Sequence, residues 1–563
     1  MSFLIEGLAF IGLIFVSLVQ SKPGMRTRLS LFPHWCERAL RRPFIAILLV
    51  GLLAFAASEL VTVFAGIPQP RVHDEFSYLL AADTFAHARI TNPPHPLWKH
   101  FESFHVIQQP TYASKYPPAQ GLMLALGQVV FGHPIVGVWL STGIACAAIC
   151  WMLVGWCPLR WALMGGLLAV GRIVFSGPAF LGERVFIGYW SQSYWGGTVA
   201  AAGGALVFGA LPRIMKKQRV QDSLWLALGL AILANSRPFE GLVVSIPVLI
   251  VLSIWIVRTK GISWRRILHR IGLPVVLVFL LAALWMGFYN FRVTGDPFLM
   301  PYQTHESTYG VTPVFLWQPL KSEPPYNHRS LRDFYTGWAW GWYKTQPSFA
   351  GWLWMARYKI VLLWFFFIGF LLSPFLASLY WMRRRKSVQF ALGTCALLII
   401  VLLAETYALP HYAAPATSLV FLLVVESLRQ ARFAKWRGKE VGQSLVRAVL
   451  PALLVCQIAW FAVERIPASS EWWTVRARIM GALEQDKNRH LVIVRYGPKH
   501  SPNAEWVYNR ADIDAAKVVW AREMGPQVDR ELLEYFKDRR VWLLEVEQAE
   551  WRLTPYAVGK SDK

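Results

Sequence analysis

The sequence predicts a mostly α-helical protein with many membrane spans and a small α/β domain at its C-terminal end. Hydrophobic residues make up 55% of the 563 residues, and they come in runs too long for a soluble core. Lysine and arginine crowd the short linkers between those runs, which is the positive-inside pattern of a polytopic membrane protein. The net charge of +24 therefore reflects membrane topology, and it does not require a nucleic-acid partner.

The chain opens with an apolar stretch, 3–20, that carries Glu6 and has no small-residue cleavage site after it. We interpret 1–42 as a weak first span followed by a basic cytoplasmic linker, because a cleaved signal peptide would begin with basic residues. Met25 offers an alternative translation start, and a chain that began there would lack this first span.

The region 43–464 is predicted to be the main transmembrane domain, which gives about 11–13 spans in the whole chain. Several of its apolar stretches are shorter than the roughly 20 residues that cross the hydrocarbon layer, so their ends must extend into the flanks or the helices are broken. The predicted spans are 43–66, 135–157, 162–180, 196–211, 224–236, 241–257, 271–289, 360–381, 391–404, 414–425 and 446–463.

The basic linkers also predict which loops face outward. Arg41 and Arg42 place the start of the span 43–66 inside, so the loop 67–118 faces outward. The same alternation puts the following three segments outside: 290–359, 405–413 and the tail after 464. The short apolar piece 119–132 is predicted to be a surface or partly inserted helix, because a full crossing would put a basic linker on the outer side.

The tail, 465–563, is predicted to be a separate extracytoplasmic α/β domain. Strands are expected at 490–496, 517–521 and 541–546, with a helix over 529–539. The tail has no glycine-rich phosphate loop, so we assign no catalysis to it.

The outward loop 67–118 carries an acidic pair, Asp74 and Glu75, only a few residues after a span. Apolar residues recur after it at near-helical spacing, which predicts a helix lying on the bilayer surface. The pair could cap that helix, since carboxylates favour a helix N-terminus. Alternatively, a carboxylate at this interface could take the proton from an acceptor hydroxyl while a cationic side chain neutralises a departing phosphate.

Other polar residues in outward segments could supply that cationic group or contact a sugar. Lys115 and Tyr116 stand directly before two prolines that stiffen the next membrane entry. Arg237 could bind a phosphate or simply snorkel to headgroups. In the segment GERVFIGYWSQSYWGG, a mixture of polar and aromatic residues suits sugar stacking, although an aromatic belt at the interface would look similar; its polar and tyrosine residues include Glu183, Arg184, Gln192 and Tyr194.

The order of motifs in this region resembles a known family. DEFSY, then TFAHARI, then SKYPPAQGLMLALG are similar to the first periplasmic loop of the C-type membrane glycosyltransferases. The branch is that of the protein O-mannosyltransferases and the lipid A aminoarabinose transferase, which has an Asp-Glu motif and then a Lys-Pro-Pro or similar motif. Tyr116 departs from that pattern because it stands between the lysine and the prolines. The resemblance covers 43 to about 159, and elsewhere it amounts to span layout and an outward tail.

The resemblance implies an enzyme of the bacterial inner membrane that moves a sugar from a polyprenyl-phosphate donor to an extracytoplasmic acceptor, whether protein, lipid or polysaccharide. Asp74 and Glu75 are the expected catalytic residues, with Asp74 as the general base. The expected substrate-binding residues are Tyr78, Lys115, Tyr116, Arg237, His411 and Tyr412; the last two come from the motif ETYALPHYAAP.

The resemblance requires no cofactor, and we assign no metal ligands. Some relatives use a divalent cation, which an Asp-Glu-His cluster in the loop 67–118 could hold. Two other functions stay open from the sequence: a transporter or flippase for lipid-linked sugars, and a non-catalytic scaffold for envelope assembly. The sequence offers no inverted repeat and few charged residues in mid-span to support transport.

Overall fold

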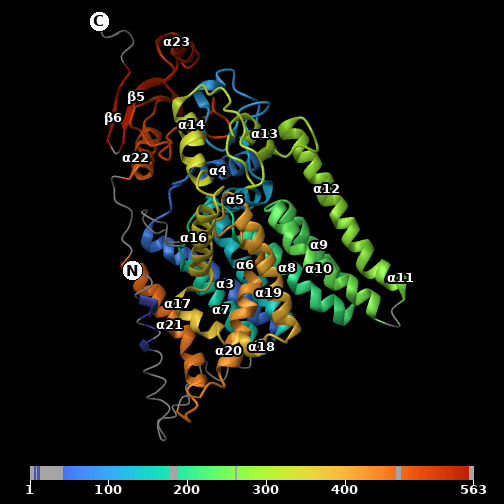
Figure 1. Cartoon of the computed structure of the whole chain (residues 1–563). Helices are drawn as coiled ribbons and strands as arrows, with labels where there is room; N and C mark the ends of the chain where they lie inside the picture. The colour runs from blue at the N-terminus through green and yellow to red at the C-terminus, as the bar shows by residue number, and fades with distance from the viewer. Residues whose placement is uncertain are drawn as a thin grey trace.

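A computed structural model describes residues 42–177, 188–259, 263–435, 437–463, 471–548 and 550–556, with six further residues between 5 and 12. The predicted first span, 3–20, lies for the most part outside the described residues. The chain forms a long bundle of helices that carries a small sheet domain at one end (Figure 1). This is the predicted fold class.

Among the described residues, seven helices are long and apolar enough to cross a membrane. An eighth span would be the pair α16 (Phe349–Phe367) and α17 (Gly369–Leu376), which is bent by 98°. The seven are α3 (Pro43–Ala65), α6 (Pro134–Trp156), α8 (Thr198–Lys217), α10 (Pro238–Arg258), the run Trp264–Thr294 that ends in α12 (Leu273–Thr294), α19 (Lys386–Ala404) and α21 (Gly442–Val463).

Three more predicted spans form shorter helices. They are α7 (Leu159–Phe175), α9 (Val220–Ala234) and α20 (Thr417–Ala431), of 17, 15 and 15 residues. Helix α20 is buried along most of its length, so its apolar residues face other helices more than lipid.

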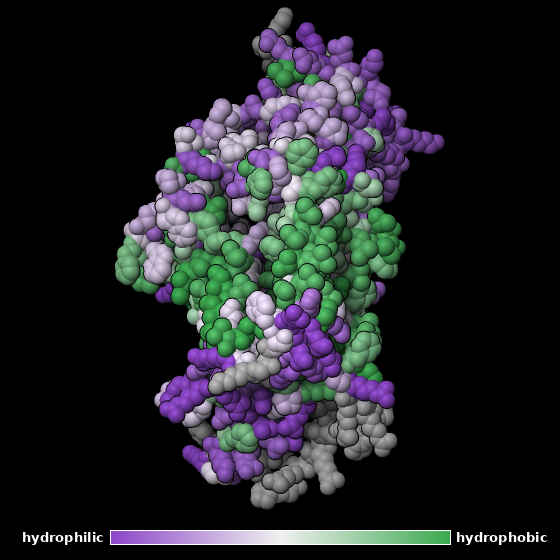
Figure 2. All heavy atoms as spheres, turned by 90° about the vertical axis from the view of Figure 1, so that its right-hand side faces the viewer, coloured by the Kyte–Doolittle hydropathy of each residue, from purple (hydrophilic) through white to green (hydrophobic). Residues whose placement is uncertain are grey.

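The outer surface of the bundle is apolar. Figure 2 shows hydrophobic side chains in a belt between two polar ends of the molecule. On α12, for example, Leu280, Leu281 and Leu284 are 54%, 59% and 70% exposed. So large an exposed apolar surface is stable only against lipid, so the chain is a multi-pass membrane protein.

Helix α5 (Pro118–Phe131) is the short apolar piece after the acidic loop. Its 14 residues span about 21 Å, which is less than the hydrocarbon layer of about 30 Å. It packs closely against α6, and a Cβ atom at Gly137 of α6 would lie only 2.0 Å from the carbonyl oxygen of Met123. The absence of a side chain at Gly137 therefore brings α5 and α6 together beneath α4 (His73–Ala86).

The tail forms a four-stranded sheet in the order β4-β3-β5-β6. The predicted strands are confirmed as β3 (His490–Tyr496), β4 (Val518–Arg522) and β5 (Arg540–Glu547), and the predicted helix as α23 (Pro526–Tyr535). Strand β3 is parallel to β4 and β5, whereas β6 (Glu550–Pro555) is an antiparallel edge strand. The sequence did not predict β6 or the helix α22 (Trp472–Gln485).

The two faces of this sheet are covered by different parts of the chain. Helix α22 covers one face through Val475, Ile479 and Leu483. The other face packs against the loop 67–118. Phe76 and Leu80 of α4 belong to the hydrophobic core between that loop and the sheet. The prediction that α4 rests on the bilayer surface is therefore wrong, because its apolar residues pack inside the protein: Phe76 and Leu80 against the tail, and Leu79 and Phe85 against the bundle and the loop 67–118.

Candidate active site

The first turn of α4 places Glu75 in the protein interior. Its side chain is 3% exposed, and its two oxygens accept hydrogen bonds from the backbone N–H groups of Arg71 and Tyr194, both at 3.0 Å. Burial raises the pKa of this carboxyl from 4.5 to about 7, against the opposing effect of those hydrogen bonds. Glu75 therefore connects the residue before the N-cap of α4 to the segment 188–197.

Substitution Glu75→Gln should change the pH dependence of stability. A carboxyl with a raised pKa binds its proton more tightly in the folded state, so its contribution to stability is full below 4.5 and is lost as the pH rises through about 7. We expect the melting temperature of the parent protein in detergent to fall across this window and that of the variant to fall less. Melting temperatures that fall equally with pH in the two proteins would contradict a raised pKa for Glu75.

Asp74 is held differently from its neighbour. The hydroxyl of Tyr116 donates a hydrogen bond to Oδ1 of Asp74, and Nε2 of His105 lies 3.9 Å from Oδ2. The Asp74 side chain remains 30% exposed. The ring of Tyr116 in turn stacks on Tyr78 with centroids 4.4 Å apart. One carboxylate oxygen is thus fixed by a donor, and the other can accept a proton.

Lys115 forms an ion pair next to this group. Its Nζ lies 3.3 Å from Oε1 of Glu306, and 5.5 Å from the centroid of the Tyr116 ring. Glu306 belongs to the short helix α13 (Pro301–Thr308). Burial alone would raise the pKa of Glu306, but Lys115 and His305 outweigh that effect and lower it to about 2. The carboxylate of Glu306 is therefore ionised at neutral pH.

Arg237 contacts the ring of Tyr412. The guanidinium carbon of Arg237 lies 4.3 Å from the centroid of the Tyr412 ring, and its Nη1 is 3.5 Å from Oε1 of Glu240. Arg237 precedes α10 directly, so the loop between α9 and α10 determines its position. Burial and the charge of Asp74 raise the pKa of the Tyr78 hydroxyl, and the charge of Arg237 opposes them.

His411 is more enclosed than its neighbours. It is 4% exposed, and its Nδ1 lies 2.9 Å from the hydroxyl of Tyr189, with which it shares a hydrogen bond. Burial and the nearby charge of Arg237 keep the pKa of His411 well below its usual value. The imidazole is therefore neutral, so it cannot neutralise a phosphate by charge.

The predicted site residues form two groups of side chains in contact. One group runs from Asp74 through Tyr116 to Tyr78, and the other runs from Arg237 through Tyr412 to His411, whose ring is 4.9 Å from that of Tyr412. The charges of Asp74 and Arg237 both act on the pKa of the Tyr78 hydroxyl, so the two groups lie near each other and are treated as one cluster. Four further residues touch the cluster or its supports: His105, Tyr189, Glu306 and Tyr508. Two of them had a sequence signal, His105 as one of several histidines in the loop 67–118 and Tyr189 as part of the segment GERVFIGYWSQSYWGG.

For the segment around Tyr194 the sequence left sugar stacking and an interfacial aromatic belt open, and the structure buries two of its members inside the protein. Tyr194 is 3% exposed and donates a hydrogen bond to the carbonyl of Pro68. Gln192 is also buried, accepting from Thr62 and donating to the carbonyl of Ser58, both at 2.7 Å. These side chains fix the segment within the bundle. Glu183 and Arg184 lie outside the described residues.

The side chains around Asp74 do not fit a metal site. In the part of the chain that the structure describes, no three His, Cys, Asp or Glu side chains are grouped to hold a metal ion. His105 is the histidine that lies beside Asp74, while both oxygens of Glu75 are taken by backbone N–H groups. We therefore derive no step through a metal.

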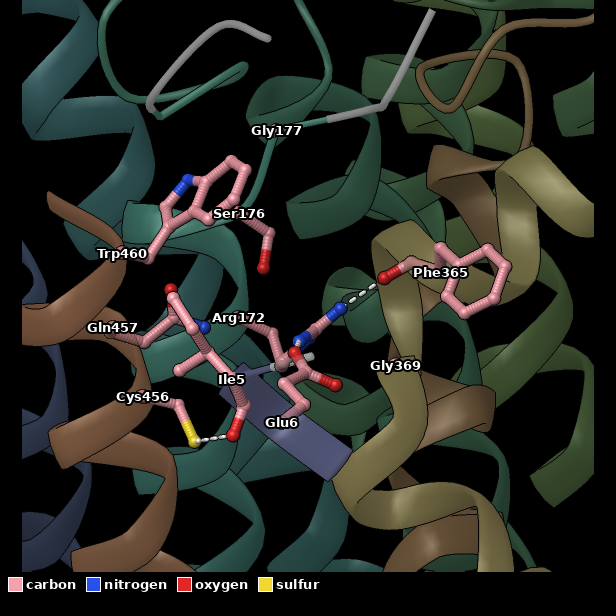
Figure 3. Close-up of a pocket in the computed structure, with 10 residues that line it drawn as sticks. All are labelled: Ile5, Glu6, Arg172, Ser176, Gly177, Phe365, Gly369, Cys456, Gln457 and Trp460. Carbon is pink, nitrogen blue, oxygen red and sulfur yellow. Dashed lines mark hydrogen bonds and ion pairs between the residues drawn. The ribbon is translucent and has the colours of Figure 1, made fainter. Parts of the chain in front are cut away.

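A pocket lies deeper in the bundle, away from this cluster (Figure 3). An ion pair between Arg172 and Glu6 lies within it, with Nη1 and Oε1 2.6 Å apart. None of the predicted site residues lines it. Its lining residues are Ile5, Glu6, Arg172, Ser176, Gly177, Phe365, Gly369, Cys456, Gln457 and Trp460.

No protein-family model matches the chain, and no curated protein matches it. Its fold is similar to that of ArnT from Cupriavidus metallidurans in the apo state, with a TM-score of 0.49 and 13% identity over 88% of this chain and 92% of that one.

It is also similar to the Archaeoglobus fulgidus oligosaccharyltransferase in the apo form, with a TM-score of 0.46 and 10% identity over 89% of this chain and 69% of that one. The complex of that enzyme with Zn and sulfate has a TM-score of 0.45 and 12% identity, over 89% and 67% of the two chains. At these identities the likeness is one of fold alone.

Proposed function

We propose that the protein is a membrane glycosyltransferase that moves a sugar from a polyprenyl-phosphate donor to an extracytoplasmic acceptor, with Asp74 as general base. The observation that carries the proposal is the arrangement of Asp74, which has one oxygen fixed by Tyr116 and a side chain that is still 30% exposed. The motifs DEFSY and SKYPP, which resemble those of C-type glycosyltransferases, lie together in this cluster.

The reaction that fits this arrangement is a direct displacement. Asp74 takes the proton from an acceptor hydroxyl, whose oxygen then forms a bond to the anomeric carbon of the sugar. The bond between that carbon and the phosphate oxygen breaks, and the polyprenyl phosphate leaves with one more negative charge. Arg237 and Lys115 are the cationic side chains of the cluster that can neutralise this charge. Displacement in one step inverts the configuration at the anomeric carbon.

A gene deletion tests the function and separates it from transport. We expect the deletion strain to lose one sugar-bearing component of its envelope and to accumulate the lipid-linked sugar on the outer leaflet. A transporter would instead leave that lipid on the cytoplasmic leaflet, where a non-permeant reagent that oxidises sugars does not reach it. Envelope glycoconjugates unchanged by the deletion would contradict the proposal, as would accumulation on the inner side.

Substitution Tyr116→Phe should slow the reaction without abolishing it. The variant keeps the ring that stacks on Tyr78 and removes the hydroxyl that donates to Asp74. We expect about a tenfold lower transfer rate, because the carboxylate loses the donor that orients it. The rate is measured in detergent, with a lipid extract of the deletion strain as donor and membranes of the same strain as acceptor. A rate equal to that of the parent would show that this hydrogen bond plays no part.

A further inference from the structure

The tail domain reaches the acidic motif through one side chain, Tyr508. Its hydroxyl lies 2.8 Å from Nδ1 of His73, and the two groups share a hydrogen bond in the interior. Its ring lies parallel to that of Phe76, with centroids 3.9 Å apart and planes 2° apart. His73 and Phe76 stand on either side of Asp74 in the first turn of α4. The tail thus holds the turn that presents the proposed base.

Tyr508 is itself held firmly by the tail. Arg476 of α22 donates hydrogen bonds to the carbonyl oxygens of Trp506 and Tyr508, both at 2.8 Å. The same guanidinium lies 5.1 Å from the centroid of the Phe76 ring. Tyr508 is 7% exposed, so water does not compete for its hydroxyl. Its position is therefore set by α22 and by the core of the sheet.

A second contact fixes the tail against the loops around the site. Arg522 of β4 forms an ion pair with Glu505 in which the two side chains are 2% and 1% exposed. Arg522 also donates to the carbonyl oxygen of Glu102 at 2.7 Å and to Oγ of Ser330 at 2.6 Å. These bonds connect the tail to the segments before α5 and before α16.

The far side of His73 is closed as well. Its ring stacks on Phe104 with centroids 4.1 Å apart, and Phe334 and His105 meet its edge. Burial lowers the pKa of His73 to about 3; a backbone hydrogen bond with Pro502 of the tail opposes that effect, and the charges of Arg522 and Lys115 act in the same direction as burial. The imidazole is neutral and is packed between the loop and the tail. Its orientation therefore follows that of Tyr508.

We propose that Tyr508 is a positioning residue: through His73 and Phe76 it sets the orientation of the α4 turn that carries Asp74, so that the tail completes the active site. This inference rests on the proposed function for its catalytic meaning. Effective general-base catalysis depends on placing the carboxylate within about an ångström of its working position. We therefore expect loss of the Tyr508 contact to lower the transfer rate, but by less than removal of the Asp74 carboxylate does.

Substitution Tyr508→Phe tests the hydrogen bond while keeping the stacked ring. We expect the maximal transfer rate to fall about tenfold, with the half-saturating amount of donor extract changed by less than about twofold, because the donor contacts stay in place. The donor is again the lipid extract of the deletion strain. An unchanged maximal rate would overturn the proposal, and so would a loss confined to the half-saturating amount.

The matched control is Tyr535→Phe, which removes a tyrosine hydroxyl from the same domain. Tyr535 donates to Asp514, so its hydroxyl bond stays within the tail and does not involve Arg522 or Glu505. We expect this variant to keep the parent rate. A loss equal to that of Tyr508→Phe would mean that any weakening of the tail slows the enzyme, which would refute a specific role for Tyr508.

A double-mutant cycle adds a readout that general destabilisation does not produce. If Tyr508 acts through His73, then His73→Leu combined with Tyr508→Phe should lose no more rate than the worse single variant. Multiplied losses would overturn the coupling between the two residues.

Amide hydrogen exchange tests the docking without the reaction. Tyr508→Phe should speed exchange in the first turns of α4 and leave the strands β3 and β4 protected. Unchanged exchange in α4 would contradict the docking. An Asp74→Asn variant with intact transfer would refute the proposed function. The exchange measurement would still test the contact of Tyr508 with α4, because it does not depend on the reaction.

Discussion

Substitution Asp74→Asn should lower the transfer rate by about 10³-fold, which is the middle of the range for general acid–base catalysis. Asparagine has nearly the same shape, and its amide oxygen can still accept the hydrogen bond from Tyr116. It cannot take a proton from the acceptor hydroxyl, so the loss should lie in the chemical step. The variant is also expected to accumulate the lipid-linked donor as the deletion strain does.

The matched control for this variant is Asp83→Asn on the same helix. The two oxygens of Asp83 accept from Nε2 of Gln128 and from the backbone N–H of Ala511, which gives this carboxylate a structural role. The Asp83→Asn variant should be less stable than the parent but should transfer the sugar at a similar rate. Transfer unchanged in Asp74→Asn, at normal amounts of protein in the membrane, would refute Asp74 as the base.

A large loss of stability is expected when the ion pair in the pocket of Figure 3 is broken. Arg172 and Glu6 are buried, and Glu6 also accepts hydrogen bonds from the backbone N–H groups of Phe370 and Leu371, at 2.5 and 3.1 Å. Those groups follow the break between α16 and α17, where an uninterrupted helix would have satisfied them. One carboxylate thus neutralises a buried cation and caps a broken helix.

Substitution Glu6→Gln should therefore destabilise the protein by about 3–5 kcal/mol, because it leaves Arg172 charged and uncompensated in the interior. The measurement is thermal unfolding in detergent, with Glu59→Gln on the exposed surface of α3 as the control. Replacing both Glu6 and Arg172 with methionine should recover much of the loss, since no buried charge is then left unpaired. A Glu6→Gln variant as stable as the parent would contradict this account.

The helices and the tail strands were predictable because their signals are local. Apolar runs such as 43–66 and 135–157 coincide with α3 and α6, and the strand 490–496 coincides with β3. The edge strand β6 escaped prediction because its sequence, EWRLTP, is exposed and has no continuous apolar run. The face of α4 was misjudged because an apolar helix face looks the same whether it meets lipid or another domain.

The site was predictable only as far as it lies in the loop 67–118 and in the turns between spans. Asp74, Tyr116 and Arg237 stood out as polar groups at the ends of apolar stretches. The supporting groups did not, since Glu306 and Tyr508 lie 191 and 435 positions from their partners Lys115 and His73. The separate roles of Asp74 and Glu75 also depend on which backbone N–H groups lie nearby, and no local pattern encodes that.

The contact between His73 and Tyr508 also bears on the order of events during synthesis. Residue 73 leaves the ribosome long before residue 508, and all the candidate membrane spans after α3 are made between the two. The turn around Asp74 must therefore wait, without its final packing partner, until almost the whole chain has been made. A nascent or truncated protein would contain Asp74 and Glu75 but lack the contact with Tyr508. The full transfer rate should therefore be reached only after translation has ended.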